Sequence, residues 1–449
     1  MEADRCGHRK AGAMMRKRTG LAVVLLLCLS LWGCQKTGEM PETEANQRPD
    51  GTVFMMTATD LHYLSPKLTD YGEAFTKMMA RGDGKMSDYA SQLTDAFLWK
   101  VTAEKPDVLI LSGDLAFNGE KQSHVDLAEK LAAVRAQGIP VAVLPGNHDV
   151  QYPFSFRYEG SDIYRTANVS PEEFTEIYQD MGYAQALSRD EHSLSYVFPV
   201  SEDVRLLMLD VNAVEKQGNV PEETLSWVEQ QLAQAERDGV TVIGVSHQNL
   251  MVHNDLFIRG YRIGNYNRVL ELFAKYGVNL NLSGHIHIQH IARDTDYCEA
   301  ATGSLAVYPH LYGVVDITKQ GDIAYRAEET DVTGWAKANG VETPELLDFK
   351  TLSAKRFEDS NSGKILEELE YLDVTDSQRK AMGELVVTMN RLYFSGHLWE
   401  EKERIREQEA WKLLEAQGEE LFLNEYLNSL MDGGTSPANE LLIPGKKEQ

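Results

Sequence analysis

Residues 107–114 read DVLILSGD, an apolar run that ends in a glycine and an aspartate. A short apolar run bounded by turn-forming residues predicts a buried β-strand. Further runs of this kind alternate with helical patterns from residue 52 to about residue 330. This alternation predicts a layered α/β domain over residues 52–330.

Six apolar runs predict strands, and four stretches between them predict helices. The predicted strands are Val53–Thr59, Asp107–Ser112, Pro140–Leu144, Arg205–Leu209, Val240–Val245 and Val278–Leu282. The predicted helices are Asp88–Ala103, Leu127–Ala136, Glu222–Arg237 and Val269–Tyr276. Residues 151–192, rich in Tyr, Phe, Arg and acids, interrupt the pattern. We interpret them as an insertion with one helix near Pro171–Met181, which either lies over a site or is a solvated excursion.

The strand pattern stops after residue 331. Within Asp376–Phe394 the apolar residues recur on one face of a helix. Glu400–Met431 has the composition of a long charged helix. The sequence therefore predicts a C-terminal all-helical domain over residues 331–449, and it does not indicate what that domain does.

The first 33 residues have the pattern of a secretion signal. Three basic residues at 16–18 precede the apolar run 21–31, which is too short to cross a bilayer as a helix. The run ends in Leu-Trp-Gly-Cys at 31–34, which resembles a bacterial lipobox. This resemblance implies a signal peptide over 1–33, a lipidated Cys34, a flexible tether over 34–51 and an extracytoplasmic, membrane-tethered lipoprotein. An uncleaved N-terminal anchor helix is the alternative.

The charge balance excludes some classes of function. The chain carries 44 basic and 69 acidic residues, for a net charge of −25. Nucleic-acid-binding proteins need a basic surface, so this balance argues against nucleic acid as a partner. A phosphate substrate would need a locally positive site, which bound metal ions could supply. After processing only Cys34 and Cys298 would remain of the four cysteines, which excludes a disulfide framework.

Chemically active side chains follow five of the predicted strands, at the point where each strand ends. Sites in open α/β sheets form at the carboxyl ends of the strands, so these side chains can converge although they are far apart in sequence. The candidate metal ligands are Asp60, His62, Asp114, Asn147, His247, His285 and His287, and His148 and Asp149 follow Asn147 directly.

The residue types indicate which metal ions the site would bind. Carboxylate, amide and imidazole groups suit manganese, iron or zinc. Seven such groups are too many for one tetrahedral zinc ion, and they suit two divalent ions that share a carboxylate. Such a pair of ions can hold a bridging hydroxide and clamp a phosphoryl group. The sequence therefore predicts two divalent metal ions and a small phosphoester substrate.

Together the five segments resemble the calcineurin-like metallophosphoesterase superfamily over roughly residues 52–317. The resemblance implies a four-layer α/β/β/α sandwich, and it divides the ligands between two ions with Asp114 bridging. One ion would be held by Asp60, His62, Asp114 and His287, and the other by Asp114, Asn147, His247 and His285. His253 and His290 are alternatives to His247, which we prefer because it follows the apolar run 242–245.

By the same resemblance His148 does not bind a metal. It would contact the phosphate and help to protonate the leaving oxygen, with Asp149 orienting its ring. An imidazole held by a carboxylate suits this work as a general acid. We therefore predict His148 and Asp149 as the catalytic residues.

Two segments bear on the branch of the superfamily. Phe117 stands where purple acid phosphatases have a metal-binding tyrosine, which disfavours a ferric site of that kind. Residues 112–120 resemble the bacterial class III cyclic nucleotide phosphodiesterases. Residues 60–85, the lipoprotein signal and the helical tail together resemble a secreted, membrane-tethered subgroup of those enzymes.

Four further residues are candidate substrate contacts. Tyr63 and Asn118 lie close to metal-binding motifs in the sequence. Arg157, in the insertion, either binds phosphate or pairs with an acidic residue. His124 is either a substrate contact or a residue on a helix surface.

We therefore predict an enzyme that hydrolyses phosphodiesters, with 3′,5′-cyclic nucleotides as the first candidate substrates, by attack of a metal-bridging hydroxide. A phosphomonoesterase, a nucleotidase or an envelope phosphodiesterase of the same fold is the enzymatic alternative. A non-catalytic lipoprotein that binds a ligand is the alternative from another class.

Overall fold

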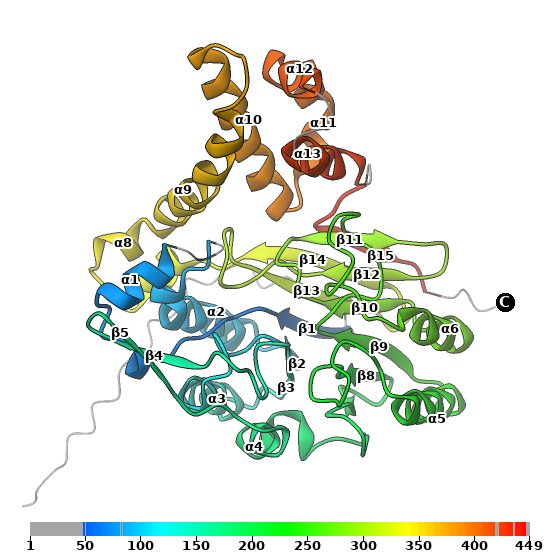
Figure 1. Ribbon diagram of the computed structural model, residues 1–449. Coiled ribbons are helices and arrows are strands. Elements are labelled where there is room, and N and C mark those ends of the chain that lie inside the picture. The colour runs from blue at the N-terminus through cyan, green and yellow to red at the C-terminus, as the bar shows by residue number, and fades with distance from the viewer. Residues whose placement is uncertain are drawn as a thin grey trace, which may run out of the picture. The chain divides into compact units, whose positions relative to one another are not determined.

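The computed structural model describes residues 48–49, 51–80, 82, 84–417, 422–433 and 436–445 (Figure 1). The predicted signal peptide, the lipidation site Cys34 and most of the predicted tether lie outside the described residues. No helix within those residues is both long enough and apolar enough to span a membrane.

The first sheet has six strands in the order β15-β14-β13-β1-β2-β3. β1, β2 and β3 run parallel to one another, whereas β13, β14 and β15 extend the sheet in antiparallel pairs. The residues of β2 are all buried, in agreement with its apolar sequence. The strands are β1 Val53–Ala58, β2 Val108–Ser112, β3 Val141–Leu144, β13 Leu311–Ile317, β14 Ile323–Glu329 and β15 Glu440–Ile443.

The second sheet has seven strands in the order β11-β12-β10-β9-β8-β7-β6. Its four central strands, β12, β10, β9 and β8, are parallel, and the outer pairs are antiparallel. The strands are β6 Ser188–Arg189, β7 Tyr196–Pro199, β8 Val204–Leu209, β9 Thr241–Ser246, β10 Leu280–Ser283, β11 His290–Arg293 and β12 Cys298–Ala301.

The alternation of side chains along β8 shows how the layers stack. Leu206 and Met208 lie in the largest hydrophobic core, which also contains residues of the first sheet. Leu207 and Leu209 point to the other face, because successive residues of a strand alternate, and they pack with residues of α5 and α6. The second sheet therefore has the first sheet on one face and helices on the other.

The helices complete the sandwich. α2 and α3 contribute to the core on the outer face of the first sheet, while α5 and α6 cover the second sheet (Figure 1). This is the predicted four-layer α/β/β/α arrangement, which the structure confirms. The helices of this part are α1 Glu73–Met79, α2 Ala90–Glu104, α3 Lys121–Arg135, α4 Pro171–Ile177, α5 Glu222–Asp238 and α6 Tyr266–Tyr276.

The predicted insertion contains a hairpin of β4 (Phe156–Glu159) and β5 (Asp162–Arg165), followed by α4. A capping box starts α4: the Ser170 hydroxyl accepts from the Glu173 backbone N–H at 3.2 Å, and the Glu173 carboxylate accepts from the Ser170 N–H at 3.0 Å. The helix ends at Ile177, earlier than predicted, and a π-helical turn follows.

The C-terminal region is largely helical, as predicted. The apolar face of its α10 packs in a separate hydrophobic core with residues of α11, α12 and α13. Its helices are α7 Val332–Ala338, α8 Pro344–Leu347, α9 Phe349–Leu369, α10 Asp376–Phe394, α11 Leu398–Glu407, α12 Glu409–Ala416 and α13 Phe422–Asp432.

Two details of this region differ from the prediction. The expected long helix over Glu400–Met431 is broken, and the extended backbone of Gln408 separates α11 from α12. This break allows Ile405 and Trp411 to enter the same core. The region is also not all-helical, because β15 returns to the first sheet and pairs with β14. A strand of four residues was too short to be recognised from its pattern.

His124 lies in α3 and is fully buried, so it is neither a substrate contact nor a residue on a helix surface. Its Nε2–H donates to the Asp149 carbonyl at 3.1 Å, and its Nδ1 accepts from the Tyr178 hydroxyl at 3.0 Å. Burial lowers the pKa of His124 to about 4. The folded protein therefore holds this imidazole neutral at pH 5.

This pKa makes the stability of the protein depend on pH. An unfolded histidine takes up a proton below about pH 6.5, whereas folded His124 does so only near pH 4, so stability is lost as the pH falls between these values. The expected loss from this residue is about 2 kcal/mol at pH 5. Denaturant unfolding of chelated protein at pH 7 and pH 5 should show a smaller loss for His124→Gln than for wild type. The exposed His192 provides the control, and equal pH dependence of His124→Gln and His192→Gln would contradict this prediction.

Candidate metal centre

The carboxyl ends of β1, β2, β3, β9 and β10 deliver the predicted ligands to one place. Two groups of carboxylate and imidazole side chains form there, and within each group the potential ligand atoms lie within 4.8 Å of one another. Asp114 belongs to both groups. The first group consists of Asp60, His62, Asp114 and His287, and the second of Asp114, His247 and His285.

In the first group, the nitrogen and oxygen atoms that could bind a metal ion point toward one another. The Nε2 atoms of His62 and His287 are 3.2 Å apart, and His287 Nε2 is also 3.2 Å from Asp60 Oδ1. The second carboxylate, Asp114, has its Oδ2 3.7 Å from His62 Nε2. Ligand atoms that share an ion at bond lengths of roughly 2.0–2.2 Å have separations of this size.

The Asp60 carboxylate provides a further sign that a cation belongs here. Its Oδ1 is buried and has no hydrogen-bond partner, although Oδ2 accepts from the Thr59 hydroxyl and the His285 backbone N–H. A buried carboxylate oxygen without a partner is costly unless a cation balances it. Burial alone would raise the pKa of Asp60, but His287 and His247 hold that pKa well below its usual range.

In the second group, backbone contacts fix the orientation of both histidines. His247 Nδ1 donates to the Ser112 carbonyl at 3.0 Å, so its Nε2 faces Asn147 Oδ1 at 3.1 Å and Asp114 Oδ1 at 3.2 Å. His285 Nε2 donates to the Gly260 carbonyl at 2.9 Å, which leaves Nδ1 as its ligand atom. Metal-binding histidines are commonly oriented by such bonds through the other ring nitrogen.

The electrostatics of His247 reflect the same arrangement. Burial would lower its pKa, but the neighbouring Asp114 carboxylate raises the pKa to about 9. A proton on Nε2 then balances the two oxygens that face it. A metal ion has to displace this proton, so metal uptake at His247 is favoured by higher pH.

These residues fit two divalent cations. The donors are oxygen and nitrogen atoms without a thiolate, and the shared Asp114 presents one oxygen to each group. The buried clusters are consistent with a dimetal site, in which Asp114 would bridge the two ions and Asn147 would join the second group through its Oδ1.

The backbone at this site is strained. Five of the predicted ligands have left-handed backbone conformations, which are uncommon outside glycine and cost about 1–3 kcal/mol each. The residues are Asp60 (φ 52), His62 (φ 41), Asp114 (φ 48), His285 (φ 69) and His287 (φ 63). These conformations turn the chain sharply after β1, β2 and β10, where the side chains of both groups come together.

Glycine is required where the turning segments approach one another. At Gly113 (φ +99) a Cβ atom would lie 2.5 Å from His247 Nδ1. At Gly284 a Cβ atom would collide with Thr59 and lie 2.6 Å from Asp60 Oδ2. Both glycines therefore allow the motif segments to pack against each other.

His148 lies beside the two groups without belonging to either. Its backbone N–H donates to Asp114 Oδ1 at 2.8 Å, and its ring is 5.2 Å from the ring of His62. Its Nδ1 contacts Asn118 Oδ1 at 3.0 Å, and the ring stacks on Tyr152 with centroids 4.6 Å apart. The ring is therefore held by Asn118 and Tyr152.

The predicted role of Asp149 in orienting His148 is wrong. The Asp149 carboxylate accepts three backbone N–H groups instead, from Gly146 at 2.7 Å, Ala116 at 2.9 Å and Leu115 at 3.1 Å. Burial, together with the charge of Asp114, raises the pKa of Asp149 to about 7. Asp149 thus ties the segments after β2 and β3 together and is a positioning residue rather than a catalytic one.

Two predicted substrate contacts are not brought to the centre. Tyr63 is 2% exposed and packs in the main hydrophobic core. It follows His62 directly and forms a short bridge with Ala116. Arg157 lies on the exposed side of β4, where it pairs with Glu159 at 2.5 Å and stacks on Tyr164.

The alternatives to His247 also lie elsewhere. His253 and His290 contact each other through their Nδ1 atoms at 3.0 Å, and His253 Nε2 lies 3.2 Å from Glu299. Neither belongs to the two groups around Asp114.

Sequence reasoning missed three residues beside the centre. Tyr152 lies four positions after His148, and its place in the insertion was the available signal. The ring of Tyr261 is 5.2 Å from the ring of His285. Burial is the main cause that lowers the pKa of His62, and the positive charge of the nearby Lys85 is the second. No motif in the sequence pointed to Tyr261, and Lys85 ends the segment 60–85 without a role having been predicted for it.

Comparisons with known proteins add to this geometry. A family model described as calcineurin-like phosphoesterase matches residues 57–289. A second model, described as the C-terminal domain of cyclic nucleotide phosphodiesterase, matches residues 331–435. A search of curated proteins finds no significant match.

Several solved structures are similar to this chain. A dimetal phosphatase from Danio rerio is 14% identical, with a TM-score of 0.47, and the alignment covers 62% of this chain and 96% of that one. A purple acid phosphatase from yellow lupin (Lupinus luteus) is 12% identical, with a TM-score of 0.40 and coverage of 63% and 52%. A protein described as the anchor in the inner membrane complex of Plasmodium is 13% identical, with a TM-score of 0.39 and coverage of 62% and 85%.

Proposed function

Because the chain belongs to the calcineurin-like phosphoesterase family, we propose that the protein hydrolyses phosphodiesters, with 3′,5′-cyclic nucleotides as the substrate class, and that its two buried ligand groups would hold a pair of divalent metal ions. The observation that carries this proposal is the sharing of Asp114 between the two groups, with the imidazole of His148 directly beside them. The description of the C-terminal family model supports the substrate class.

The proposed ions are manganese, iron or zinc, because the donors are carboxylate, amide and imidazole groups. Such a pair supplies Lewis acidity, an activated water nucleophile and positive charge for the phosphoryl oxygens. The first ion would be held by Asp60, His62, Asp114 and His287. The second would be held by Asp114, Asn147, His247 and His285.

We propose that His148 donates a proton to the leaving oxygen. Asn118 Oδ1 accepts from the Nδ1–H of His148, so Nε2 is the atom that can carry and release a second proton. Stacking on Tyr152 restricts the tilt of the ring. Asn118 therefore acts as a positioning residue through His148, and it does not need to contact the substrate.

Residues 16–34 support a location outside the cytoplasm, with the protein held at the membrane by a lipid on Cys34. A periplasmic or surface-exposed enzyme would act on phosphodiesters that reach or form part of the cell envelope. Separation of native cells into membrane and soluble fractions tests this location.

The test of function is a comparison of substrates with purified protein loaded with Mn²⁺. We expect cleavage of bis-p-nitrophenyl phosphate and of cyclic AMP to exceed that of p-nitrophenyl phosphate, and to stop when a chelator is added. Preference for the monoester would indicate a phosphatase or nucleotidase instead. Absence of turnover with Mn²⁺, Fe²⁺ and Zn²⁺ would favour the alternative of a ligand-binding lipoprotein.

A further inference from the structure

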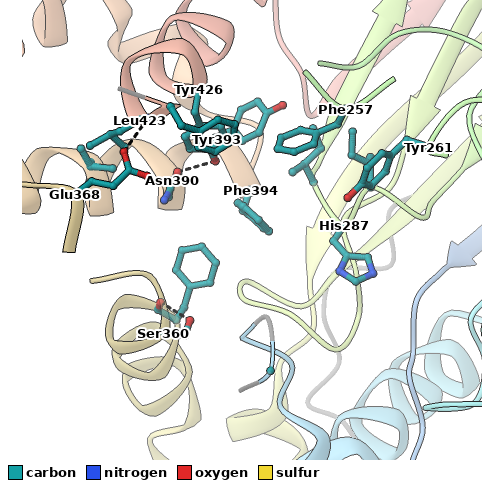
Figure 2. Close-up of a pocket in the computed structure, with 16 residues that line it drawn as sticks. Phe257, Tyr261, His287, Ser360, Glu368, Asn390, Tyr393, Phe394, Leu423 and Tyr426 are labelled. Carbon is teal, nitrogen blue, oxygen red and sulfur yellow. Dashed lines mark hydrogen bonds between the residues drawn. The ribbon is translucent and has the colours of Figure 1, made fainter. Parts of the chain in front are cut away.

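A cavity of about 490 Å³ borders the metal centre at His287. Ile286 and Ile288 flank that histidine in the cavity wall, and the loop after β9 adds Phe257 and Tyr261. The opposite wall comes from the C-terminal helices α9, α10 and α13. Figure 2 shows His287 and Tyr261 on one side and the side chains of the helices on the other. A volume of this size is ordinary for a small-molecule site.

Aromatic rings lead from the metal centre to the helices. The ring of His285 is 5.2 Å from that of Tyr261, which is 5.5 Å from that of Phe257. Phe257 is in turn 6.2 Å from Tyr426 in α13 (Figure 2). The two parts of the chain therefore share one aromatic wall that begins at a predicted metal ligand.

Hydrogen bonds hold three of the polar side chains that line the cavity. The Tyr426 hydroxyl donates to Asn390 Oδ1 at 2.8 Å, and the Tyr393 hydroxyl accepts from the Asn254 amide at 3.0 Å. Asn390 comes from α10 and points to the interior of the cavity (Figure 2). An amide held between aromatic rings can form directional hydrogen bonds to the edge of a planar, polar ring system.

The described residues of the cavity wall do not favour a second phosphate as its occupant. Among the described residues that line it there is neither a lysine nor an arginine, and the acidic group is Glu368, which accepts from the Leu423 backbone N–H at 3.1 Å. A site for a phosphate would present cationic donors. A neutral aromatic group matches these walls.

We propose that this cavity binds the nucleobase of the substrate while the phosphodiester lies at the metal centre. The inference rests on the proposed function, because it assigns a place to the base of a cyclic nucleotide. The base and the phosphate are joined through one ribose, so their two sites must be adjacent. They are adjacent here, because His287 belongs to the first ligand group and also lines the cavity. Stacking on aromatic side chains binds bases of any sequence, and hydrogen bonds at the edge of the ring provide selectivity.

The proposal gives the C-terminal helices a function. α10 and α13 supply one wall of the base site, and the loop after β9 supplies the other. The catalytic domain alone would then retain the metal ligands but lose selectivity for nucleotides over other diesters.

Substitution Phe257→Leu tests the stacking wall. In the Mn²⁺-loaded full chain we expect kcat/KM for cyclic AMP, divided by kcat/KM for the same cyclic ribose phosphate without a base, to fall about tenfold, mainly through KM. Phe257→Tyr keeps the aromatic ring and should retain most of the ratio. Tyr371→Leu, at a position 88% exposed and outside the cavity wall, removes an aromatic side chain from the same region and should leave the ratio at the wild-type value.

A binding measurement separates this proposal from the proposed function. Calorimetry with the phosphorothioate analogue of cyclic AMP, which resists hydrolysis, should show affinity about tenfold weaker for Phe257→Leu than for wild type. If wild type binds the analogue in this way but hydrolyses no cyclic nucleotide, the proposed function fails and the base site stands. If wild type hydrolyses cyclic AMP and Phe257→Leu changes neither the ratio nor the affinity, the function stands and the base site is wrong. Absence of binding to wild type would also overturn the base site.

Discussion

Substitution Asp114→Asn is expected to remove most of the bound metal and to lower kcat/KM for phosphodiesters on the order of 10³-fold or more. The carboxylate presents Oδ2 to His62 in the first group and Oδ1 to His247 in the second. An amide keeps the shape of the side chain but removes the negative charge that the two cations would share. Metal content by atomic emission and turnover of bis-p-nitrophenyl phosphate measure the two effects.

The exposed Asp203 provides a matched control for this change. Asp203→Asn removes the same charge away from the centre and should leave metal content and turnover at wild-type values. Circular dichroism checks that both variants are folded. If Asp114→Asn kept two metal ions per chain and full turnover, the assignment of Asp114 as the bridging ligand would be wrong.

Substitution His148→Ala is expected to lower kcat for cyclic AMP by about 10²–10⁴-fold with metal content unchanged. His148 lies beside both groups without belonging to either, and its ring is held by Asn118 and Tyr152. Departure of a ribose oxygen needs a proton, because an alkoxide is a poor leaving group. Departure of p-nitrophenolate needs much less assistance, so bis-p-nitrophenyl phosphate should lose far less activity.

The contrast between the two leaving groups is the decisive readout. A merely structural role for His148 would lower both rates together. Asn118→Ala should shift cyclic AMP turnover in the same direction and by a smaller factor, because it removes the acceptor that holds Nδ1. Equal losses on both substrates for His148→Ala would contradict the role of general acid.

Much of the centre could be predicted because its ligands follow strand ends. The apolar runs before Asp60, Asp114 and His247 identify buried strands. β1 and β2 are parallel neighbours in the first sheet and β9 lies in the second, and the parallel strands within each sheet end at a common edge. The types of these residues then indicated that they bind hard or borderline metal ions. This reasoning needs no knowledge of how each side chain is turned.

The contacts around His148 could not be predicted in the same way. Asp149 is adjacent in sequence, which suggested a carboxylate–imidazole pair, but its side chain is used by backbone N–H groups after β2 and β3. The actual partner, Asn118, lies 30 positions away. Adjacent residues usually point in different directions, and only the folded backbone shows which distant group fills the space.

The backbone conformations of the ligand residues could not be predicted from the sequence either. His285 and His287 are two apart, and a strand would have put them on one face. Both are instead left-handed, at φ 69 and φ 63, and they serve different groups. Positive φ at a non-glycine residue is stabilised by surrounding contacts, which local propensity does not describe.

The return of β15 to the first sheet has a consequence for how this chain could evolve or be engineered. The C-terminal helices lie in the sequence between β14 and β15, and these two strands pair with each other in the first sheet. Both ends of the helical region are therefore attached to the sheet, which keeps its side of the cavity at a high effective concentration near the metal centre. Loss of the helices from residue 331 onward would remove β15 as well and expose the backbone edge of β14 to other chains. Loss of this region during evolution would therefore require another segment to protect the edge of β14. This requirement favours inheritance of the catalytic and helical parts as a single unit.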